Sequence, residues 1–376
     1  MDIFNKALKE HRKYKGKMEI VSRVPLNNKE DLSTYYSPGV AAVSTYLAKH
    51  PDQTNIYTNT HNSVAIVSDG SAVLGLGNIG PEGALPVMEG KAILFKKFAN
   101  IDGYPIVLNT QDPNEIINIV TAIAPSFGGI NLEDISAPNC FYIEDQLKKR
   151  LTIPIMHDDQ HGTAVVVLAG LINACKVTNR KLQDSKVVLI GAGAAGVAIA
   201  KLLYQYAKPN IIAIDSKGVI TKKRKNLSPE KLLLSSYSQD NTATDLKGSL
   251  KGADIFIGVS KSNLLNKEMI QSMAKDPIIF ALANPNPEIT PNDATAAGAA
   301  VVATGRSDYP NQVNNVLAFP GLFRGALDTQ STINESHKLA AAEAIANIIK
   351  SPTKTQIIPS PFDKNVAKAV AAVYKK

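Results

Sequence analysis

The sequence predicts an α/β protein with two domains, and three observations support this fold class. Short apolar runs alternate with helical periods from about residue 64 to residue 156, as in parallel βαβ units. The alternation restarts after a long apolar helix at about 163–175. The length of 376 residues also exceeds that of one ordinary core. We therefore predict an N-terminal α/β domain with a parallel sheet at 1–160 and a C-terminal domain at 161–376.

Each predicted domain is built from short strands joined by helices. In the first, strands are expected at 64–67, 105–108, 129–132 and 153–156, with helices at 82–98, 113–124 and 139–150. In the second, strands are expected at 187–190, 211–214, 255–259, 278–282 and 300–302, with late helices at 337–349 and 365–374. The first 60 residues are less periodic and are expected to hold helices and a loop.

The composition is that of a soluble globular protein, with 44% hydrophobic and 20% charged residues. The longest apolar run, 164–172, is shorter than the roughly 20 residues that span a bilayer, and residues 1–17 lack the apolar segment of a signal peptide. Two cysteines, Cys140 and Cys175, favour reduced thiols and a cytoplasmic location. The net charge of +8 is spread along the chain and only 6% of residues are aromatic, so we expect anionic small-molecule ligands and neither a nucleic-acid nor a membrane partner.

A glycine motif lies near the start of the second predicted domain. The pattern G-x-G-x-x-G follows an apolar strand and opens a helix, and it comprises Gly191, Gly193, Ala194, Ala195 and Gly196. Its glycines permit a tight turn, a close approach of pyrophosphate to the backbone, and close packing of helix on strand. The pattern predicts a Rossmann-type dinucleotide-binding domain. A glycine-rich turn in a sheet without nucleotide is the alternative.

The strand that follows the motif ends at Asp215, 19 residues after Gly196. A carboxylate there accepts a hydrogen bond from the 2′-hydroxyl of the adenine ribose, which favours NAD. The basic cluster Lys222, Lys223, Arg224 and Lys225 offers an alternative, because it could receive the 2′-phosphate of NADP. We predict NAD, with NADP as the second possibility.

The same glycine pattern occurs earlier, at Gly75, Gly77 and Gly80. Pro81 follows it, and no acid ends a later strand at the required distance. We interpret this segment as a loop next to the substrate; a purely structural turn is the alternative.

Lys91 lies within an apolar stripe of the predicted helix 82–98. The stripe consists of Val87, Met88, Leu94, Phe95 and Phe98. A lysine there should have its pKa lowered by desolvation, so that it can act as a general base. A lysine at the edge of the stripe, with its ammonium group in water, is the alternative.

Two acidic pairs, Glu133–Asp134 and Asp158–Asp159, follow predicted strands. Ligands of parallel α/β sheets bind beyond the carboxyl ends of the strands. Converging carboxylates repel one another unless a cation is present, and oxygen ligands suit Mg²⁺ or Mn²⁺. Helix N-capping is the alternative for either pair.

His157 and His161 flank the second acidic pair at i and i+4. This spacing occurs in zinc sites. No cysteine supports such a site here, and His157 belongs to a predicted strand end, so we do not expect zinc.

Seven segments, in this order, resemble the malic enzyme family in its short bacterial form. They are YYSPGVA at 35–41, SDGSAVLGLGNIGPEGALPVMEGK at 68–91, NLEDI at 131–135, HDDQHGTA at 157–164, GAGAAG at 191–196, ALANPNPE at 281–288 and NQVNNVLAFPG at 311–321. Each segment alone would be weak support, whereas the ordered set is highly specific.

The resemblance implies roles for individual residues. Tyr36 is similar to the catalytic tyrosine of the family, Lys91 to its catalytic lysine, and Asp158 to the carboxylate that pairs with this lysine. The other implied roles are those of metal ligands (Glu133, Asp134 and Asp159), of substrate-binding residues (Asn284 and Asn315) and, for Asn284, of cofactor binding.

The activity that the resemblance implies is oxidative decarboxylation of (S)-malate to pyruvate with reduction of NAD or NADP. It also implies Mg²⁺ or Mn²⁺ and a homodimer. Decarboxylation of oxaloacetate or conversion of malate to lactate could use the same site. One departure is Val73, which replaces an arginine that holds a substrate carboxylate in larger members. Outside the family, an amino-acid dehydrogenase and a nucleotide-binding sensor without catalysis are the alternatives.

Overall fold

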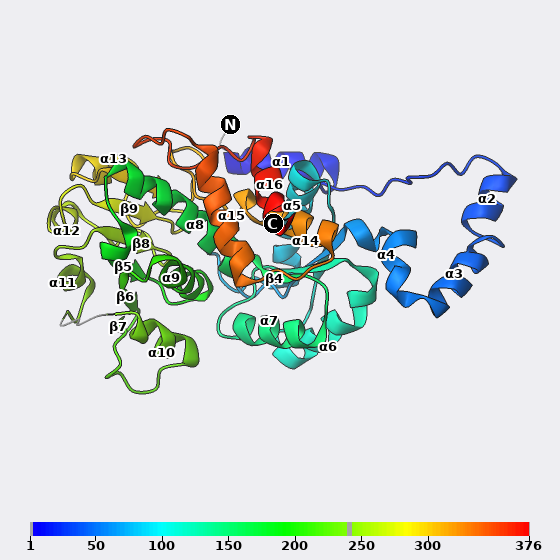
Figure 1. Cartoon of the computed structure of the whole chain (residues 1–376), viewed down its shortest axis with the longest axis horizontal. Coiled ribbons are helices and arrows are strands. Elements are labelled where there is room, and N and C mark those ends of the chain that lie inside the picture. The colour runs from blue at the N-terminus through cyan, green and yellow to red at the C-terminus, as the bar shows by residue number, and fades with distance from the viewer. Residues whose placement is uncertain (1–2, 239–242, 376) are drawn as a thin grey trace.

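Two sheets organise the chain in the computed structural model, which describes residues 3–238 and 243–375 (Figure 1). Within these residues, the first sheet has four strands in the order β2-β1-β3-β4, and all of its pairs are parallel. Its strands are β1 (Ser63–Ser68), β2 (Asp102–Val107), β3 (Gly129–Leu132) and β4 (Ile155–His157). Each overlaps a predicted strand, so the parallel α/β prediction for this part of the chain is confirmed.

Local sequence explains where the helices of the first sheet begin and end. They are α5 (Gly80–Ala99), α6 (Pro113–Ile123), α7 (Asn139–Arg150) and α8 (Asp158–Val177). Asp112 caps α6 by accepting from the backbone of Asn114 and Glu115, and Pro113 occupies the first turn. Asn100 ends α5 in a left-handed conformation with φ 51°. Although α8 is long and largely apolar, no helix in the described ranges has both the length and the hydropathy to cross a membrane.

The second sheet has the doubly wound order β10-β9-β8-β5-β6-β7 among the described residues. Its strands are β5 (Lys186–Ile190), β6 (Asn210–Asp215), β7 (Gly218–Val219), β8 (Ile255–Gly258), β9 (Ile278–Ala281) and β10 (Val301–Thr304). The order reverses between β5 and β8, which is the place where such sheets bind dinucleotides. The Rossmann-type prediction is confirmed. The two-residue antiparallel strand β7 was not predicted, because it is too short to show a period.

Helices of the second half cover both sheets. Beside the second sheet lie α9 (Ala194–Ala207), α10 (Pro229–Ser236), α11 (Leu246–Leu250), α12 (Lys267–Gln271) and α13 (Pro291–Ala296). The last helices, α14 (Phe319–Thr329), α15 (Glu335–Ile348) and α16 (Asn365–Ala371), return toward the first sheet. There α14 packs on α5, and α15 packs on α8.

One hydrophobic core joins the two halves of the molecule. Phe95 of α5 makes edge-on contacts with Phe319 and Phe323 of α14, at centroid distances of 4.7 and 5.4 Å. The same core continues through α8 to both sheets. The division of domains at residue 160 stays a prediction, since α8 itself runs across that position.

An N-terminal arm, defined here as residues 18–57, extends away from both sheets (Figure 1). It holds α2 (Lys29–Tyr35), α3 (Val40–Lys49) and α4 (Thr54–Tyr57), whereas α1 (Ile3–Tyr14) lies back near the body. No residue of the arm is buried. Its exposed large apolar side chains include Leu32, Tyr35, Tyr36, Val40, Val43, Tyr46, Ile56 and Tyr57. Large apolar side chains that lie together are uncommon on the free surface of a monomer.

Two glycines of the turn after β5 are expected to respond differently to alanine. A Cβ on Gly196 would lie 1.8 Å from the Gly191 carbonyl oxygen, whereas a Cβ on Gly193 would meet nothing within 4 Å. Gly196→Ala should therefore destabilise the protein by roughly 1–3 kcal/mol, and Gly193→Ala should leave stability nearly unchanged. Denaturant melts of both variants measure this difference. Equal stability of the two variants would contradict the close packing of α9 on β5.

Candidate active site

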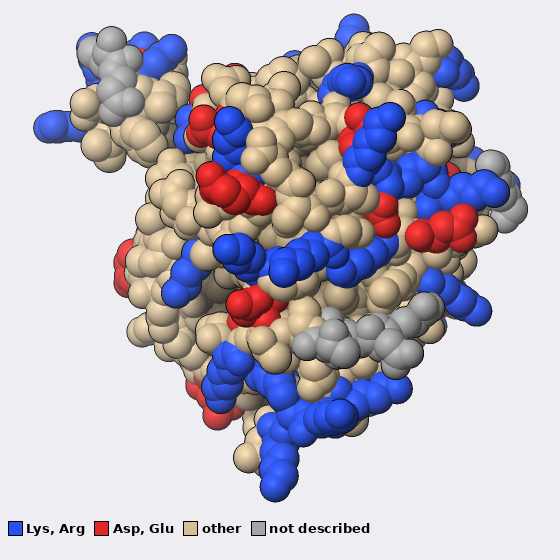
Figure 2. Space-filling model, turned by 90° about the vertical axis from the view of Figure 1, so that its left-hand side faces the viewer, with Lys and Arg blue, Asp and Glu red and all other residues tan. Residues whose placement is uncertain are grey.

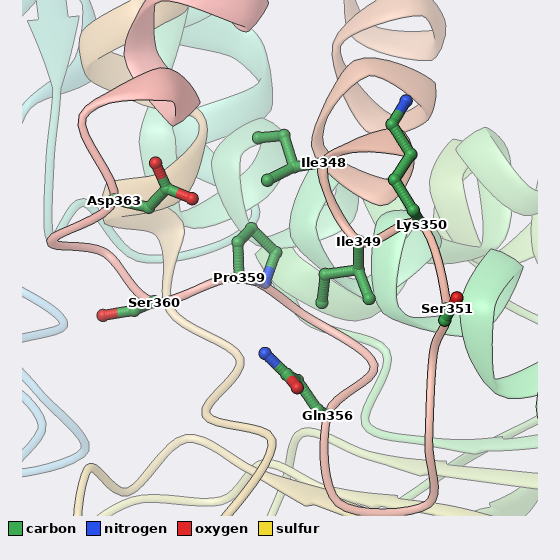
Figure 3. A pocket seen from close by; sticks show the side chains of 8 residues that line it. All are labelled: Ile348, Ile349, Lys350, Ser351, Gln356, Pro359, Ser360 and Asp363. Carbon is green, nitrogen blue, oxygen red and sulfur yellow. The ribbon is translucent and has the colours of Figure 1, made fainter.

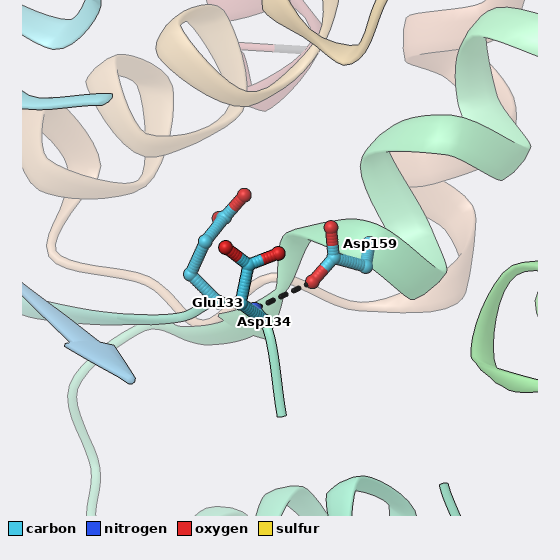
Figure 4. Close-up of side chains that lie close together, drawn as sticks. All are labelled: Glu133, Asp134 and Asp159. Atoms are coloured by element: carbon cyan, nitrogen blue, oxygen red, sulfur yellow. Dashed lines mark hydrogen bonds between the residues drawn. The ribbon is translucent and has the colours of Figure 1, made fainter. Parts of the chain in front are cut away.

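The carboxyl ends of β3 and β4 bring two acidic pairs together. The two strands are parallel neighbours, so the residues that follow them emerge at the same sheet edge. Glu133 and Asp134 follow β3, and Asp158 and Asp159 form the first turn of α8 directly after β4. Glu133, Asp134 and Asp159 offer oxygen atoms that all lie within 4.8 Å of one another (Figure 4). The Asp159 Oδ2 atom also accepts a hydrogen bond of 2.8 Å from the Asp134 backbone.

Neither acidic pair caps a helix, so the N-capping alternative is wrong for both. The N-cap of α8 is His157, and its side chain makes no capping hydrogen bond. The helix after β3 begins only at Asn139, with Pro138 at its N-cap. Both pairs therefore keep carboxylate oxygens available for another partner.

Lys91 of α5 points into this acidic cluster. Its Nζ lies 2.6 Å from Asp158 Oδ2 and 2.8 Å from Glu133 Oε1. It also lies 4.3 Å from the centroid of the Phe319 ring, an attractive position for a cation. The side chain is only 6% exposed, which excludes the alternative of a lysine that reaches into water.

The expected lowering of the Lys91 pKa is wrong for the protein in this state. Burial alone would lower the pKa of Lys91, but Asp158, Glu133 and Asp159 together raise it above its usual value. The expectation considered desolvation and omitted the neighbouring carboxylates, whose distance from Lys91 cannot be read from the sequence. As its neighbours, these carboxylates stabilise the protonated, ammonium form of Lys91.

Four carboxyl groups gather near one ammonium group, and Lys91 could not balance all of them if they were ionised. Burial, Asp159 and Glu133 raise the pKa of Asp134 to about 9, and burial and Glu133 raise that of Asp158 to about 7 against the opposing effect of Lys91. Asp134 Oδ2 and Asp158 Oδ1 are buried without a hydrogen-bond partner. Asp134 belongs to the group of three whose oxygen atoms converge, and converging carboxylate oxygens are the donor set that Mg²⁺ or Mn²⁺ prefers, so Glu133, Asp134 and Asp159 fit a divalent cation.

Two amide side chains complete the surroundings of the cluster. Asn131, in β3, donates from Nδ2 to Glu133 Oε2 at 2.8 Å. Its role was not predicted, although a polar residue within an otherwise apolar strand is the feature that could have revealed it. Asn315, the first residue of the 3-10 helix Asn315–Leu317, lies against Gly162 beside Asp158. Asn315 therefore lies beside Asp158, and its expected role in substrate binding stays a prediction.

The first glycine loop lies next to the same cluster. The backbone N–H of Ala72 donates to the Asp134 carbonyl at 2.9 Å, and a Cβ on Gly75 would lie 2.6 Å from the carbonyl oxygen of Asn284. Asn284 follows β9, so the loop after β1 faces the carboxyl edge of the second sheet. Val73, in place of the arginine of larger family members, is buried and apolar and offers no group to a carboxylate.

The predicted catalytic tyrosine lies away from the acidic cluster. Tyr36 is the C-cap of α2 in the N-terminal arm and is 69% exposed, and α2 lies away from α5, the helix that carries Lys91 (Figure 1). His161 bonds to Glu144 at 2.8 Å and to Lys338 at 2.9 Å, and His157 lies 3.9 Å from Asp159. Among the described residues, the group that could hold a metal ion consists of the carboxylates of Glu133, Asp134 and Asp159.

The turn after β5 has the geometry of a dinucleotide site. Gly191 adopts φ +111°, and α9 begins at Ala194 with its N-terminus beside the turn. Gly193 has open space at the Cβ position, where pyrophosphate would approach, with Ala195 in the first turn behind it. Asp215 ends β6 as predicted, but Arg224 and Lys231 bind its carboxylate. Their contact with the acid was not predicted, since it depends on how the loop after β7 folds back.

A separate hollow between the end of α15 and the segment before α16 contains none of the predicted site residues (Figure 3). Its walls include Ile348, Ile349, Pro359 and Asp363. Among the described residues, it holds one carboxylate, Asp363, and one ammonium group, Lys350, and no group of acids such as the one at the carboxyl ends of β3 and β4.

Comparison with known proteins agrees with this geometry. Residues 15–148 match the family described as the N-terminal domain of malic enzyme, and residues 160–375 match its NAD-binding domain. A bifunctional malic/malolactic enzyme of Bacillus subtilis is 55% identical over 100% of this chain and 93% of its own length, and an NAD-dependent malic enzyme of Geobacillus stearothermophilus is 54% identical over 94% and 75%. The crystal structure of an NAD-dependent malic enzyme from Thermotoga maritima superposes with a TM-score of 0.95, at 50% identity and 98% coverage of both chains. This chain belongs to the malic enzyme family.

Proposed function

We propose that this chain oxidatively decarboxylates (S)-malate to pyruvate and CO₂, with reduction of a nicotinamide dinucleotide and with help from a divalent cation. The observation that carries the proposal is the buried Lys91, bonded to Asp158 and Glu133 at the carboxyl edge of the first sheet, beside the glycine loop that meets Asn284. The NAD-dependent names of similar relatives support it. A glycine-rich turn alone would support only nucleotide binding. The lysine and the four acids add groups that can transfer protons and bind a cation.

The cation in this proposal is Mg²⁺ or Mn²⁺, held by Glu133, Asp134 and Asp159. Their converging oxygens and the raised pKa of Asp134 support the assignment, because a bound cation would relieve the repulsion among them. When bound, such a cation supplies Lewis-acid stabilisation of negative charge on substrate oxygen.

Lys91 and Asp158 move the proton of the substrate hydroxyl in this proposal. A lysine can accept a proton only after giving one up, and Asp158 Oδ2, 2.6 Å from Nζ, is the adjacent acceptor. Lys91 then receives the proton of the C2 hydroxyl while the hydrogen on C2 departs as hydride. Phe319 and the surrounding core exclude water from this pair.

Asn284 and Asn315 bind and orient the substrate in this proposal. Asn315 lies beside Asp158, and Asn284 lies where the first glycine loop meets the second sheet. The turn Gly191–Gly196 binds the pyrophosphate of the cofactor at the N-terminus of α9. Asp215 at the end of β6 supports NAD as a cofactor.

We also infer that the protein is a homodimer in which Tyr36 acts on the neighbouring subunit. The exposed apolar side chains of the N-terminal arm support a protein partner. Tyr36 caps α2, which lies away from α5, the helix that carries Lys91 (Figure 1), so a second copy is the partner that gives the tyrosine a reaction centre. There Tyr36 would donate a proton to C3. The free, buried Cys140 and Cys175 support a cytoplasmic location.

Conversion of malate to lactate is a second candidate function. The name of the Bacillus subtilis relative includes malolactic activity, and the same lysine, acids and dinucleotide would serve both reactions. Net production of reduced cofactor separates oxidative decarboxylation from malolactic conversion, because the latter regenerates the oxidised form.

Purified protein with (S)-malate, Mn²⁺ and NAD or NADP should show growth of absorbance at 340 nm, with pyruvate as product, and EDTA should abolish it. Lys91→Ala should lower turnover about 10²–10⁴-fold, the usual contribution of general acid–base catalysis. Lys96→Ala is the matched control, since Lys96 lies on the same helix, is 55% exposed and pairs with Asp102. Wild-type turnover in the Lys91 variant would remove this residue from the mechanism.

Mn²⁺ should raise the Tm of the protein without substrate, since a ligand that binds only the folded state stabilises it by about 2.7 kcal/mol at 100 times its Kd. Asp159→Asn should largely lose this increase, because it removes one carboxylate from the group of three. Asp145→Asn, at an exposed carboxylate of α7, should keep it. An equal Mn²⁺-dependent increase in Tm for the Asp159 variant would exclude Asp159 from the cation site.

Sedimentation velocity should give the mass of two chains for the full-length protein. Tyr46→Glu and Val43→Glu together place charge on the exposed apolar face of the arm and should shift the population to monomer. A monomeric wild type at micromolar concentration would exclude the homodimer and leave Tyr36 without a site.

A further inference from the structure

A buried chain of ionisable side chains joins α7, α8 and α15, and the proposed chemistry does not use it. Glu144 of α7 bonds to His161 of α8 at 2.8 Å, and His161 bonds to Lys338 of α15 at 2.9 Å. Figure 2 shows many Lys and Arg side chains on one face of the molecule, where water can solvate them. Lys338, in contrast, is only 2% exposed, and Glu144 is 6% exposed. Charged side chains are almost never buried to this extent unless they are paired, so the partners of this chain determine what it can do.

The contacts of His161 define one arrangement of protons. An ammonium group can only donate, so Nδ1 of His161 accepts from Lys338 Nζ, whose second partner is Glu335 at 2.9 Å. The proton of the ring therefore lies on Nε2, which donates to Glu144 Oε2. A doubly protonated ring would turn a second donor toward Lys338. The neutral imidazole thus connects a buried cation to a buried carboxylate, and Lys338 fixes the orientation in which His161 reaches Glu144.

The Glu144 carboxylate bonds to both sides of the first turn of α8. Its Oε1 atom accepts from the backbone N–H of His157 at 3.1 Å, and its Oε2 atom accepts from His161 at 2.8 Å. His157 is the N-cap of α8, and His161 lies one turn into the helix. Asp158 and Asp159 lie between these two residues in the sequence. One carboxylate therefore holds the turn that presents both acids.

Helix α7 gives Glu144 a fixed position on the first sheet. The helix packs on β4, and its buried side chains Cys140, Ile143 and Leu147 belong to the core of that sheet. Lys148, one turn further along the same helix, donates to Glu144 Oε1 at 2.7 Å. The carboxylate is therefore anchored on the sheet whose strands β3 and β4 carry the two acidic pairs. Its bonds to α8 set where the second acidic pair lies relative to the first.

We propose that Glu144, His161 and Lys338 are positioning residues that set the distance between the cation ligands of the two strands. Glu144 acts through the first turn of α8, which carries Asp159, and Lys338 acts by orienting His161. The inference rests on the cation site of the proposed function. Ligands must be held within about 0.5 Å of their productive positions, so a shift of Asp159 away from Asp134 weakens cation binding.

The alternative is that the three side chains only tie α15 to α7 and α8. A tie of this kind would contribute to the stability of the protein, and its loss would lower the Tm. It would leave the Mn²⁺ affinity of the folded protein unchanged, because the ligands themselves would not move. The Tm and the Mn²⁺ affinity together therefore separate a structural role from a positioning role.

The experiment is titration calorimetry of the full-length protein with Mn²⁺, without malate or nucleotide, at a temperature well below the Tm of each variant. Glu144→Gln should raise the Kd for Mn²⁺ about tenfold or more, the lower end of the usual effect for residues that orient metal ligands. The glutamine can still accept from the His157 backbone, but its amide turns a donor toward the donor of His161. Asp145→Asn is the matched control, since Asp145 is the next residue of α7, is 55% exposed and pairs with Lys149 one turn away. This control should change the Kd by less than about twofold.

Variants at two further positions test the route through His161. His161→Met, which removes both ring nitrogens, should raise the Kd as much as Glu144→Gln does. His161→Gln should lose less affinity than His161→Met, because its amide keeps a donor for Glu144. Lys338→Met has an apolar side chain of similar length and should raise the Kd about threefold or more. Glu144→Gln combined with Lys338→Met should be no weaker than Glu144→Gln alone, since both changes act through the same imidazole.

A lower Tm with an unchanged Kd for Mn²⁺ in Glu144→Gln and His161→Met would overturn the proposal, and so would equal weakening by Asp145→Asn. A combined variant whose loss equals the product of the two single losses would overturn the route from Lys338 to Glu144. If Glu144→Gln does not fold, the variants at His161 and Lys338 make the same comparison. A wild type that binds no Mn²⁺ would overturn both this inference and the proposed cation site. A wild type that binds Mn²⁺ but oxidises no malate would contradict the proposed function alone.

Discussion

Burial of more negative than positive charge around one ammonium group is the constraint on which the candidate active site depends. Glu133, Asp134 and Asp158 are buried beside Lys91, and Asp159 adds a fourth carboxylate. One lysine cannot balance four acids, and a low-dielectric environment strengthens their repulsion. The fold must therefore hold these groups together against their own charge, and this requirement is the physical basis for a divalent cation at the same place.

Backbone geometry and packing around the cluster meet this requirement. Parallel pairing of β3 and β4 brings the two acidic pairs to one edge. Asp134 adopts a left-handed φ of 54°, and Asn131 holds the Glu133 carboxylate. Gly162 leaves room for the Asp158 side chain, since a Cβ there would lie 1.8 Å from its Oδ1 atom. Phe319 belongs to the core that joins the two halves, and its ring also contacts Lys91. The packing between the two halves therefore also fixes the position of the lysine.

The acidic cluster around Lys91 and the surroundings of Asp215 have opposite ratios of acidic to basic groups. Near the acidic cluster the negative charges outnumber the positive one, which favours a metal ion. Around Asp215 the positive charges of Arg224 and Lys231 outnumber the one negative charge. In both places a single residue type suggested one chemistry, and its neighbours in space changed the conclusion: Lys91 is held as a cation, and Asp215 is a partly neutralised acid.

The sequence by itself determined the α/β class, the doubly wound second half, the glycine turn and the sheet edge where the acids meet. These features follow from local periodicity, glycine spacing and the general rule that parallel strands end together. Only the tertiary structure decided that Glu133 joins Asp158 as a partner of Lys91, that Arg224 and Lys231 bind Asp215, and that Tyr36 lies on the exposed N-terminal arm. Those outcomes depend on distances between side chains from different elements, and electrostatic energies change steeply with such distances.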